Sequence, residues 1–248
     1  MKIKLINPNT TLEMTESIRL VAEKYKAAGT EIIAVSPKTG PDSIETFMDD
    51  YLAVPGVLKE IIDGDRKEHA DAYVIACFGD PGLKAAREVT TKPVVGIAEA
   101  AILISELIAP SFSIISVLDR SVQITRELVY GYGAERRCKS VRSTGLEVLE
   151  FNRNPQKGLE VLKREAEKAV REDGAECILL GCAGFVDFVQ DLRKTLGVPV
   201  LDGVVPALKL AEAMVGAGLS TSKINTWKKP ENKEIKGFPM FDEDDLAF

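Results

Sequence analysis

The chain alternates between two hydrophobic patterns from its first residues to about residue 215. Short runs of consecutive apolar residues predict buried strands, whereas longer segments with apolar residues three or four positions apart predict helices packed on one face. Eight runs predict strands, at residues 3–7, 31–36, 72–76, 92–95, 113–117, 139–142, 177–180 and 198–201. Because helical segments separate nearly all of these runs, the pattern predicts an α/β fold with parallel sheets.

Capping residues and prolines indicate where the predicted helices begin and end. Thr10 or Thr11 is a candidate N-cap for a helix that reaches about residue 28, and Gly29 is its candidate C-cap. A second helical stretch ends near residue 64, and we expect Pro55 to interrupt it. Further helices are predicted at residues 120–130, 155–172 and 206–215, and between the paired strands at 72–76 and 92–95 and at 177–180 and 198–201.

One segment of the chain is repeated, with a cysteine at the same place in each copy. Residues 70–95 align with residues 175–201 after the insertion of one residue, and each copy has a strand, Cys-x-Gly, a helix and an x-Pro-Val strand. Chance often produces paired βαβ units in this fold class, but seldom the same cysteine at the same strand end. The repeat therefore predicts two related α/β lobes that face each other.

This repeat also predicts how the chain is divided. We expect residues 1–97, together with a last helix and its continuation at about 207–227, to form the first lobe. Residues 98–206 are expected to form the second lobe. Residues 228–248 are a polar tail with an acidic end, which we expect to wrap the surface or to lie loose.

Charge and composition narrow the possible functions. The 248 residues include 32 Lys and Arg and 38 Asp and Glu, so no basic surplus is available for nucleic acid or an anionic membrane. No apolar segment has the length of a signal peptide or a membrane span, so we expect a cytoplasmic protein whose four cysteines are reduced. The single histidine, His69, excludes a histidine-rich metal site and leaves little basis for a Ser-His-Asp hydrolase.

Several common catalytic and cofactor motifs are absent from the sequence. It contains no GxGxxG, Walker A, GxSxG or CxxC pattern, so neither a nucleotide cofactor nor a metal is predicted. Cys138 and Cys177 are isolated from other ligand residues and are expected to be structural.

Cys77 and Cys182 are the residues to which the sequence assigns chemistry. Each follows an apolar strand and precedes a glycine and a helix, and parallel sheets bind ligands beyond the carboxyl ends of their strands. We expect backbone N–H groups and the positive helix end to favour a thiolate there. A lone buried cysteine is more often a packing residue, but the duplication weakens that interpretation. Two opposed thiols suit removal of a proton from one face of a carbon acid and its return to the other, which is racemisation without a cofactor.

Other candidate ligand contacts lie at the same predicted sheet edges. They are Asn9, Thr10, Ser43, Ile44, Phe78, Gly79, Ser116, Val117, Ala183 and Gly184. The backbone N–H groups after each cysteine are candidate donors to a carbonyl oxygen on which negative charge develops. Asn9 and Thr10 are equally well explained as helix-capping residues, and the weakest candidates are those at positions 43–44 and 116–117.

Five segments carry a resemblance to a known family, namely residues 6–10 (INPNT), 76–82 (ACFGDPG), 132–136 (YGAER), 172–175 (EDGA) and 180–184 (LGCAG). Together they resemble the hydantoin and allantoin racemase group of the aspartate/glutamate racemase superfamily. The resemblance implies two Rossmann-like parallel-sheet lobes related by pseudo-symmetry, with the active site in the cleft between them. It also implies a two-base mechanism without PLP, with Cys77 and Cys182 as the catalytic pair. A small cyclic ureide substrate and a homo-oligomer are further implications.

A racemase of 5-substituted hydantoins is therefore the leading hypothesis. At Gly79 the chain departs from several hydantoin racemases, which have an acidic residue there, so allantoin stays open as the substrate. Other enzymes of the superfamily, such as an aspartate racemase, a maleate isomerase or a decarboxylase, are alternatives. The alternative from a different class is a protein that binds a small molecule without catalysis.

Overall fold

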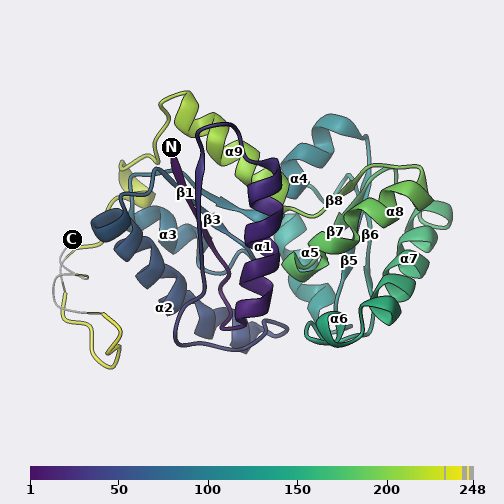
Figure 1. Ribbon diagram of the computed structural model, residues 1–248, viewed down its shortest axis with the longest axis horizontal. Coiled ribbons are helices and arrows are strands. Elements are labelled where there is room, and N and C mark those ends of the chain that lie inside the picture. The colour runs from purple at the N-terminus through teal and green to yellow at the C-terminus, as the bar shows by residue number, and fades with distance from the viewer. Residues whose placement is uncertain (232, 242–244, 246–248) are drawn as a thin grey trace.

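Residues 1–231, 233–241 and 245 are described by the computed structural model, and their strands form two parallel sheets that lie side by side (Figure 1). The first sheet contains β1 (Lys2–Ile6), β2 (Glu31–Val35), β3 (Ala72–Ile75) and β4 (Val94–Gly96). The second contains β5 (Phe112–Ser116), β6 (Cys138–Ser143), β7 (Ile178–Leu180) and β8 (Val200–Leu201). The predicted fold class, with two parallel-sheet α/β lobes, is confirmed.

The two sheets have the same strand order, β2-β1-β3-β4 and β6-β5-β7-β8. β3 and β7 therefore hold equivalent places, and each is followed closely by one of the two cysteines of the repeat. In the first sheet Ile6 pairs with Ile75, and in the second Ile115 pairs with Leu180. The central strands of each sheet thus end level with one another, which brings the segments after them to one edge.

Helices cover both faces of the sheets. The α-helices are α1 (Leu12–Tyr25), α2 (Phe47–Asp63), α3 (Leu83–Val89), α4 (Ile97–Ile108), α5 (Ser121–Gly131), α6 (Glu150–Arg153), α7 (Pro155–Arg171), α8 (Val189–Leu196) and α9 (Val204–Gly216). A π-helix, η1 (Gly64–Glu68), continues α2, and 3-10 helices occur at η2 (Ala183–Phe188) and η3 (Asn225–Trp227). Thr46 begins α2 with a reciprocal capping box to Asp49, which fixes the first turn of this helix near the edge where the cysteines lie.

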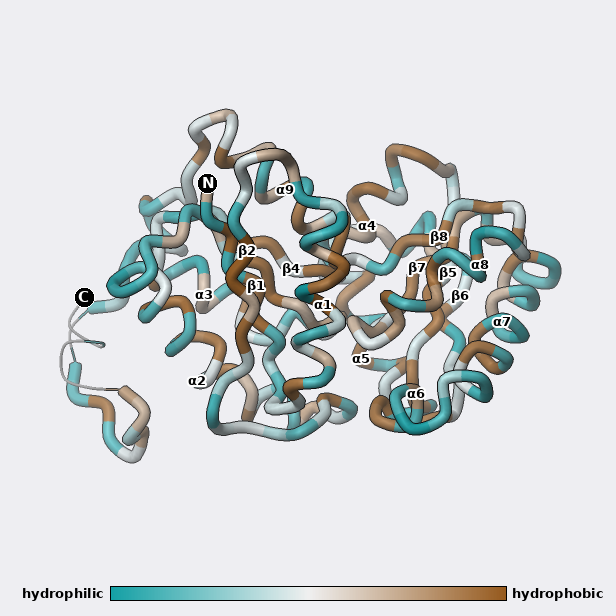
Figure 2. The backbone as a smooth tube through the Cα atoms, viewed as in Figure 1, coloured by the Kyte–Doolittle hydropathy of each residue, from teal (hydrophilic) through white to brown (hydrophobic). Residues whose placement is uncertain are grey.

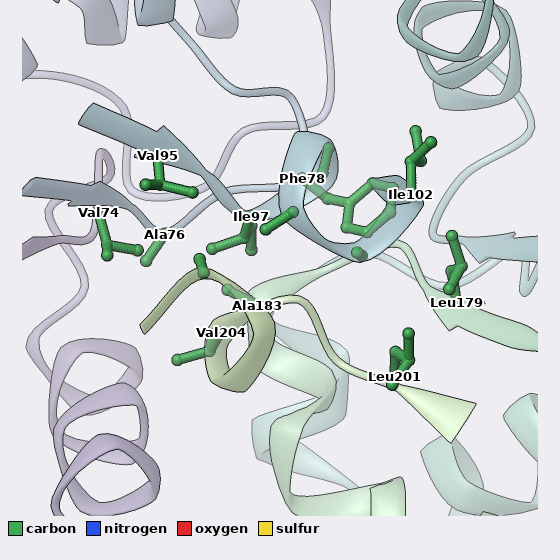
Figure 3. Packing of buried hydrophobic residues seen from close by; sticks show 14 of the residues in the cluster. Val74, Ala76, Phe78, Val95, Ile97, Ile102, Leu179, Ala183, Leu201 and Val204 are labelled. Atoms are coloured by element: carbon green, nitrogen blue, oxygen red, sulfur yellow. The ribbon is translucent and has the colours of Figure 1, made fainter. Parts of the chain in front are cut away.

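α4 and α9 join the two sheets into one core. α4 starts where β4 ends and contacts β7, while α9 packs on α4, α1, β3 and β4. Figure 3 shows side chains of the first sheet, such as Val74, and of the second, such as Leu179, on either side of Ile97 and Phe78. Figure 2 shows the same distribution along the chain, with apolar strands inside and hydrophilic turns on the outer helices α7 and α8. Burial of this shared apolar surface holds the two halves together.

All eight predicted strands occur, with ends that differ from the prediction by at most two residues. The prediction that Pro55 interrupts the second helix was wrong, because α2 runs continuously through it. A proline inside a helix removes one backbone donor, here the partner of the carbonyl of Tyr51. Tyr51 is 70% exposed, whereas Ala53 and Val57 are fully buried, so the cost falls on the solvent side while the buried face holds the helix together.

α4 and α6 were not predicted. The twelve residues of α4 include nine alanines, leucines and isoleucines and lack a clear polar face, so the periodicity that identifies a surface helix is weak there. α6 is a single turn of four residues, too short for a periodic pattern.

The C-terminal tail lies against the first half of the molecule. Ile235, Phe238 and Phe241 line an apolar groove formed by α2 and α3, and Asp245 pairs with Arg66 and Lys59. The remainder of the predicted acidic end, residues 242–244, lies outside the described residues. The division of the chain into lobes stays a prediction. None of the described helices combines the length and the apolarity needed to cross a membrane.

Candidate active site

A small cavity of about 50 Å³ lies where the segments after β1, β3, β5 and β7 meet, at the junction of the two sheets. Nine of the residues predicted as catalytic or ligand-binding line it: Asn9, Ile44, Cys77, Phe78, Gly79, Ser116, Val117, Cys182 and Ala183. The repeat and the strand order thus bring both cysteines, which follow strands of different sheets, to one cavity.

Three predicted contacts do not line the cavity. Thr10 donates through both its backbone N–H and its hydroxyl to the carbonyl of Pro41, at 2.9 and 3.3 Å, so it fastens the loop after β2. The backbone N–H of Gly184 donates to the sulfur of Cys182 at 3.4 Å and so contacts the thiol itself. Ser43 lies in the loop before α2 and is not among the lining residues, although its neighbour Ile44 is.

The surroundings of the two thiols differ from the expectation in one respect. The predicted backbone donors are present, because the N–H of Gly79 and that of Gly184 each form a hydrogen bond to the preceding cysteine and lower its pKa. Burial outweighs this effect: it raises the pKa of Cys182 to about 12 and raises that of Cys77 as well. Burial thus disfavours the thiolate form of both cysteines and makes each thiolate, once formed, a stronger base.

A polar network fixes the turn that follows Cys77. Asp80 adopts a positive φ of 47°, and its carboxylate accepts hydrogen bonds from the backbone N–H groups of Ala98 and Glu99 at 3.1 and 2.9 Å. The hydroxyl of Tyr132, at the end of α5, donates to the same carboxylate at 2.6 Å. Burial raises the pKa of Asp80 to about 7, although these hydrogen bonds act in the opposite direction. Through Asp80, the Cys77 turn is thus connected to α4 and to a residue of the second half.

The Asn-Pro-Asn-Thr loop supplies one amide to the cavity. Buried Asn7 donates to the side chain of Asn9 at 2.8 Å, and the oxygen of Asn9 in turn accepts the backbone N–H of Thr11 at 2.9 Å. The amide nitrogen of Asn9 contacts only the thioether sulfur of Met14, at 3.5 Å, among the described residues. A thioether is a weak acceptor, so this N–H is available to a ligand carbonyl.

Hydroxyl groups of β5 and α5 also line the cavity. The hydroxyl of Ser116, at the end of β5, lies 2.9 Å from that of Ser121 and 3.4 Å from that of Thr125. Ser121 and Thr125 are four positions apart and lie on one face of α5, a spacing that does not by itself identify a ligand site. The sequence therefore indicated Ser116 but not the two α5 hydroxyls.

Two carboxylates at the start of α2 were also missed. Glu45 and Asp50 line the cavity, with the negative charge of Asp50 acting on Cys77 and that of Glu45 on Cys182. Glu45 accepts the backbone N–H of Val148 at 2.7 Å, which connects this loop to the second half. In the sequence these acidic residues flank the capping pair Thr46 and Asp49, so they are explained equally well as helix-start residues. The remaining unpredicted lining residues are Met14, Thr46, Ala76, Ser121, Ile124, Thr125, Val148 and Gly181.

The charges that face the cavity have one sign. No lysine, arginine or histidine is present among its described lining residues. Across residues 1–231, 233–241 and 245, no group of three or more His, Cys, Asp or Glu side chains is arranged to hold a metal ion. Thiols, hydroxyls, an amide and carboxylates, without a cation, favour a small neutral ligand that offers both N–H and carbonyl groups.

Comparison with known proteins defines the class. Residues 3–211 match the Asp/Glu/Hydantoin racemase family, and the chain belongs to this family. It is therefore a racemase, an isomerase that acts on a small molecule, and the alternative of a binding protein without catalysis is set aside.

Individual members of the family are similar over nearly the whole chain. The hydantoin racemase of Pseudomonas sp. (strain NS671) is 52% identical over 237 residues, which cover 96% of this chain and 95% of that protein. The structure of allantoin racemase from Klebsiella pneumoniae is 43% identical, covers 96% of each chain and has a TM-score of 0.93. That of allantoin racemase from Pseudomonas fluorescens is 38% identical, covers 96% of this chain and all of that one, and has a TM-score of 0.92.

Proposed function

We propose that this racemase interconverts the enantiomers of 5-substituted hydantoins, without a cofactor, by proton transfer at C5 between Cys77 and Cys182. The observation that carries the proposal is that both thiols, one from each sheet, line the same cavity. A planar ring held between them exposes one face to each sulfur. The similarity to a hydantoin racemase over 96% of the chain supports the choice of substrate.

The proposed reaction begins with one cysteine as thiolate and the other as thiol. The thiolate takes the C5 proton and becomes a thiol, and the electron pair of the C–H bond moves into the ring as an enolate on the C4 oxygen. The opposite thiol then delivers its proton to the other face of C5 and becomes the thiolate. No atom is consumed, and the roles of the two cysteines are exchanged for the reverse reaction.

The high pKa of the buried thiols suits this step. A C5 proton next to a carbonyl is weakly acidic, and a thiolate with a raised pKa is the stronger base toward it. The enolate oxygen needs donors at the moment when charge develops. The side-chain N–H of Asn9 and the hydroxyl of Ser116 line the cavity and are suited to this role.

Allantoin is the second candidate substrate, and the likeness to two allantoin racemase structures favours it. It is also a hydantoin, with a ureido group at C5, so the same proton transfer applies. An acidic amino acid fits less well, because the charged side chains among the described lining residues are carboxylates, which repel its carboxylate groups.

The function is tested by polarimetry with enantiopure 5-benzylhydantoin and, separately, enantiopure allantoin. Purified protein is used without added PLP or metal, and a sample without enzyme corrects for spontaneous racemisation. We expect the rotation of at least one substrate to decay to zero, and the larger kcat/KM identifies the preferred one. Constant rotation of both substrates with folded protein contradicts the proposal.

We further propose that the protein acts as a homo-oligomer in the cytoplasm. The resemblance to the hydantoin and allantoin racemase group implies the homo-oligomer. Leu103 and Leu107 are 48% and 80% exposed and lie one turn apart on α4, which supports burial of this face by a second copy. Light scattering coupled to size-exclusion chromatography tests the association, and a mass of one chain at micromolar concentration contradicts it.

A further inference from the structure

Asp50 occupies a place in the cavity that neither helix capping nor the proton transfer explains. It is the fourth residue of α2, half-buried, and lines the cavity together with Cys77 and Gly79. The capping role at this helix start belongs to its neighbour Asp49, whose carboxylate accepts the backbone N–H groups of Glu45 and Thr46 at 3.1 and 3.0 Å. The Asp50 side chain therefore forms no capping hydrogen bond at the start of the helix.

The Asp50 carboxylate has an acceptor without a donor. Its Oδ1 atom is buried and receives no hydrogen bond from any described residue. None of the cavity-lining residues in the described part of the chain is a cation that would neutralise it. Burial raises its pKa to about 6, so it is largely ionised at neutral pH although its surroundings disfavour the charge. An ionised oxygen in this position is a strong acceptor for a ligand N–H group.

Gly79 shows how near this carboxylate lies to the reacting thiol. A Cβ atom at position 79 would lie 2.6 Å from Oδ1 of Asp50 and 3.7 Å from Sγ of Cys77. The first distance is shorter than real Cβ contacts allow, so the carboxylate takes up the space that a side chain at position 79 would need. The Asp50 carboxylate is thus a hydrogen-bond acceptor close to the thiol that takes the C5 proton.

We propose that Asp50 is the specificity-determining residue of this racemase, and that its carboxylate accepts a hydrogen bond from the ring N–H bonded to C5 of the cyclic ureide. This inference rests on the proposed function, because it names the side chain that recognises the ring N–H of the substrate at the same site. The contact orients the ring with C5 beside Cys77. It selects for ureides, which carry this N–H, against ring compounds with an acceptor atom there and against anions, which the carboxylate repels.

The test compares two substrates that differ at one ring atom. 5-Benzylhydantoin has N–H next to C5, and 5-benzyloxazolidine-2,4-dione has oxygen there, with little change in shape. The kcat/KM for each is measured by polarimetry with wild type, Asp50→Asn, Asp50→Ala and a control, Asp63→Asn. Asp63 ends the same helix and pairs at 2.6 Å with Lys59, away from the cavity. The intrinsic difference in C5 acidity cancels when the hydantoin preference of each variant is divided by that of wild type.

We expect Asp50→Ala to lower the hydantoin preference by about 10- to 100-fold, the range for loss of a hydrogen bond to a charged group. Asp50→Asn keeps a neutral acceptor oxygen and should retain part of the preference, and Asp63→Asn should retain all of it. A purely structural role would lower kcat/KM for both substrates by the same factor. Thermal unfolding shows that each variant is folded, and Asp50→Asn, nearly equal in size, should melt at or above the wild-type temperature.

The outcomes separate the two proposals. If wild type racemises 5-benzylhydantoin and both Asp50 variants keep the wild-type preference, the assignment of Asp50 is overturned and the proposed function stands. If wild type racemises neither compound nor allantoin, the proposed function fails and the assignment of Asp50 fails with it.

Discussion

The segments after Cys77 and Cys182 leave equivalent strands in different ways. After Cys77 the chain makes a turn stabilised by the Asp80 carboxylate, which accepts hydrogen bonds from the start of α4 and from Tyr132. After Cys182 it enters the 3-10 helix η2 directly. The position that corresponds to Asp80 in the repeat is Phe185, which is fully buried.

Phe185 supports its cysteine by packing instead of hydrogen bonding. Its ring lies 4.4 Å, between centroids, from that of Phe151 in α6, and both belong to the core cluster of the second half. The polar support of Cys77, in contrast, reaches across to the other half of the chain. The turn after the cysteine is thus fixed in both copies of the repeat, by a buried carboxylate in one and by a buried aromatic ring in the other.

The largest expected effect comes from replacing the two cysteines one at a time, which distinguishes their roles. Cys77→Ser and Cys182→Ser should each lower racemisation by about 10²- to 10⁴-fold, because a serine hydroxyl does not replace the thiol base. In D₂O each variant should still exchange the C5 hydrogen of one enantiomer, and the two variants should differ in which one. Proton NMR of the separate enantiomers measures this exchange. Full racemisation by either variant would contradict the two-base assignment.

The glycines after the two cysteines provide the second test. Gly79→Ala places a methyl group 2.6 Å from the Asp50 carboxylate, whereas a methyl group at Gly184 meets its neighbours at an ordinary 3.5 Å. We expect kcat/KM to fall about tenfold or more in Gly79→Ala, the effect of 1–3 kcal/mol of overpacking, and to change less than threefold in Gly184→Ala.

The double variant Gly79→Ala/Asp50→Ala identifies the cause of that loss. Without the carboxylate the added methyl group has space, so the double variant should be no less active than Asp50→Ala alone. If the loss of kcat/KM in the double variant equals the combined losses of the two single variants, the methyl group acts on something other than Asp50.

Removing the hydroxyl of Tyr132 tests the polar support of Cys77. Tyr132→Phe leaves the buried Asp80 carboxylate with one donor fewer, which should lower the free energy of unfolding by about 1.5–3 kcal/mol. Urea denaturation measures this change. Tyr130→Phe is the matched control, since Tyr130 is 76% exposed and its loss should cost less than about 0.5 kcal/mol. If both variants are equally stable, Asp80 does not depend on Tyr132.

The smallest expected effect is a gain in stability at Asp50. Burial raises the pKa of Asp50 from 3.8 to about 6, so the folded state binds its proton more tightly than the unfolded state does. The resulting cost is absent below the unfolded pKa and is fully present once the pH exceeds about 6. Because Asp50 is partly exposed and solvent screens its charge, Asp50→Asn should become more stable relative to wild type by only about 1 kcal/mol as the pH rises from 4 to 7. Denaturation at both pH values measures it, and a difference independent of pH would contradict the buried charge.

The strands, the repeat and the cysteine pair could be predicted, because each is identified by a pattern within a short segment of the sequence. Asp50 could not be predicted, since Asp49 and Asp50 are adjacent and both suit a helix start, and only the path of α2 decides which faces the cavity. Ser121 and Thr125 could not be predicted for the same reason, because only the direction of α5 brings their hydroxyls to the cavity. The sequence did not indicate the burial that raises the pKa of both thiols, because hydrogen bonds to the following turn are local, whereas burial depends on both sheets.

The helix that connects the two sheets bears on how the protein unfolds. α4 begins at the residue after β4 and ends shortly before β5, so the chain passes between the halves through a helix with one face in the core instead of a flexible linker. Ile97, Ala101 and Ile102 are in the core that both sheets share. Neither half can lose its structure without exposing the core of the other, so we expect one cooperative thermal transition in which both thiols lose their shared cavity together.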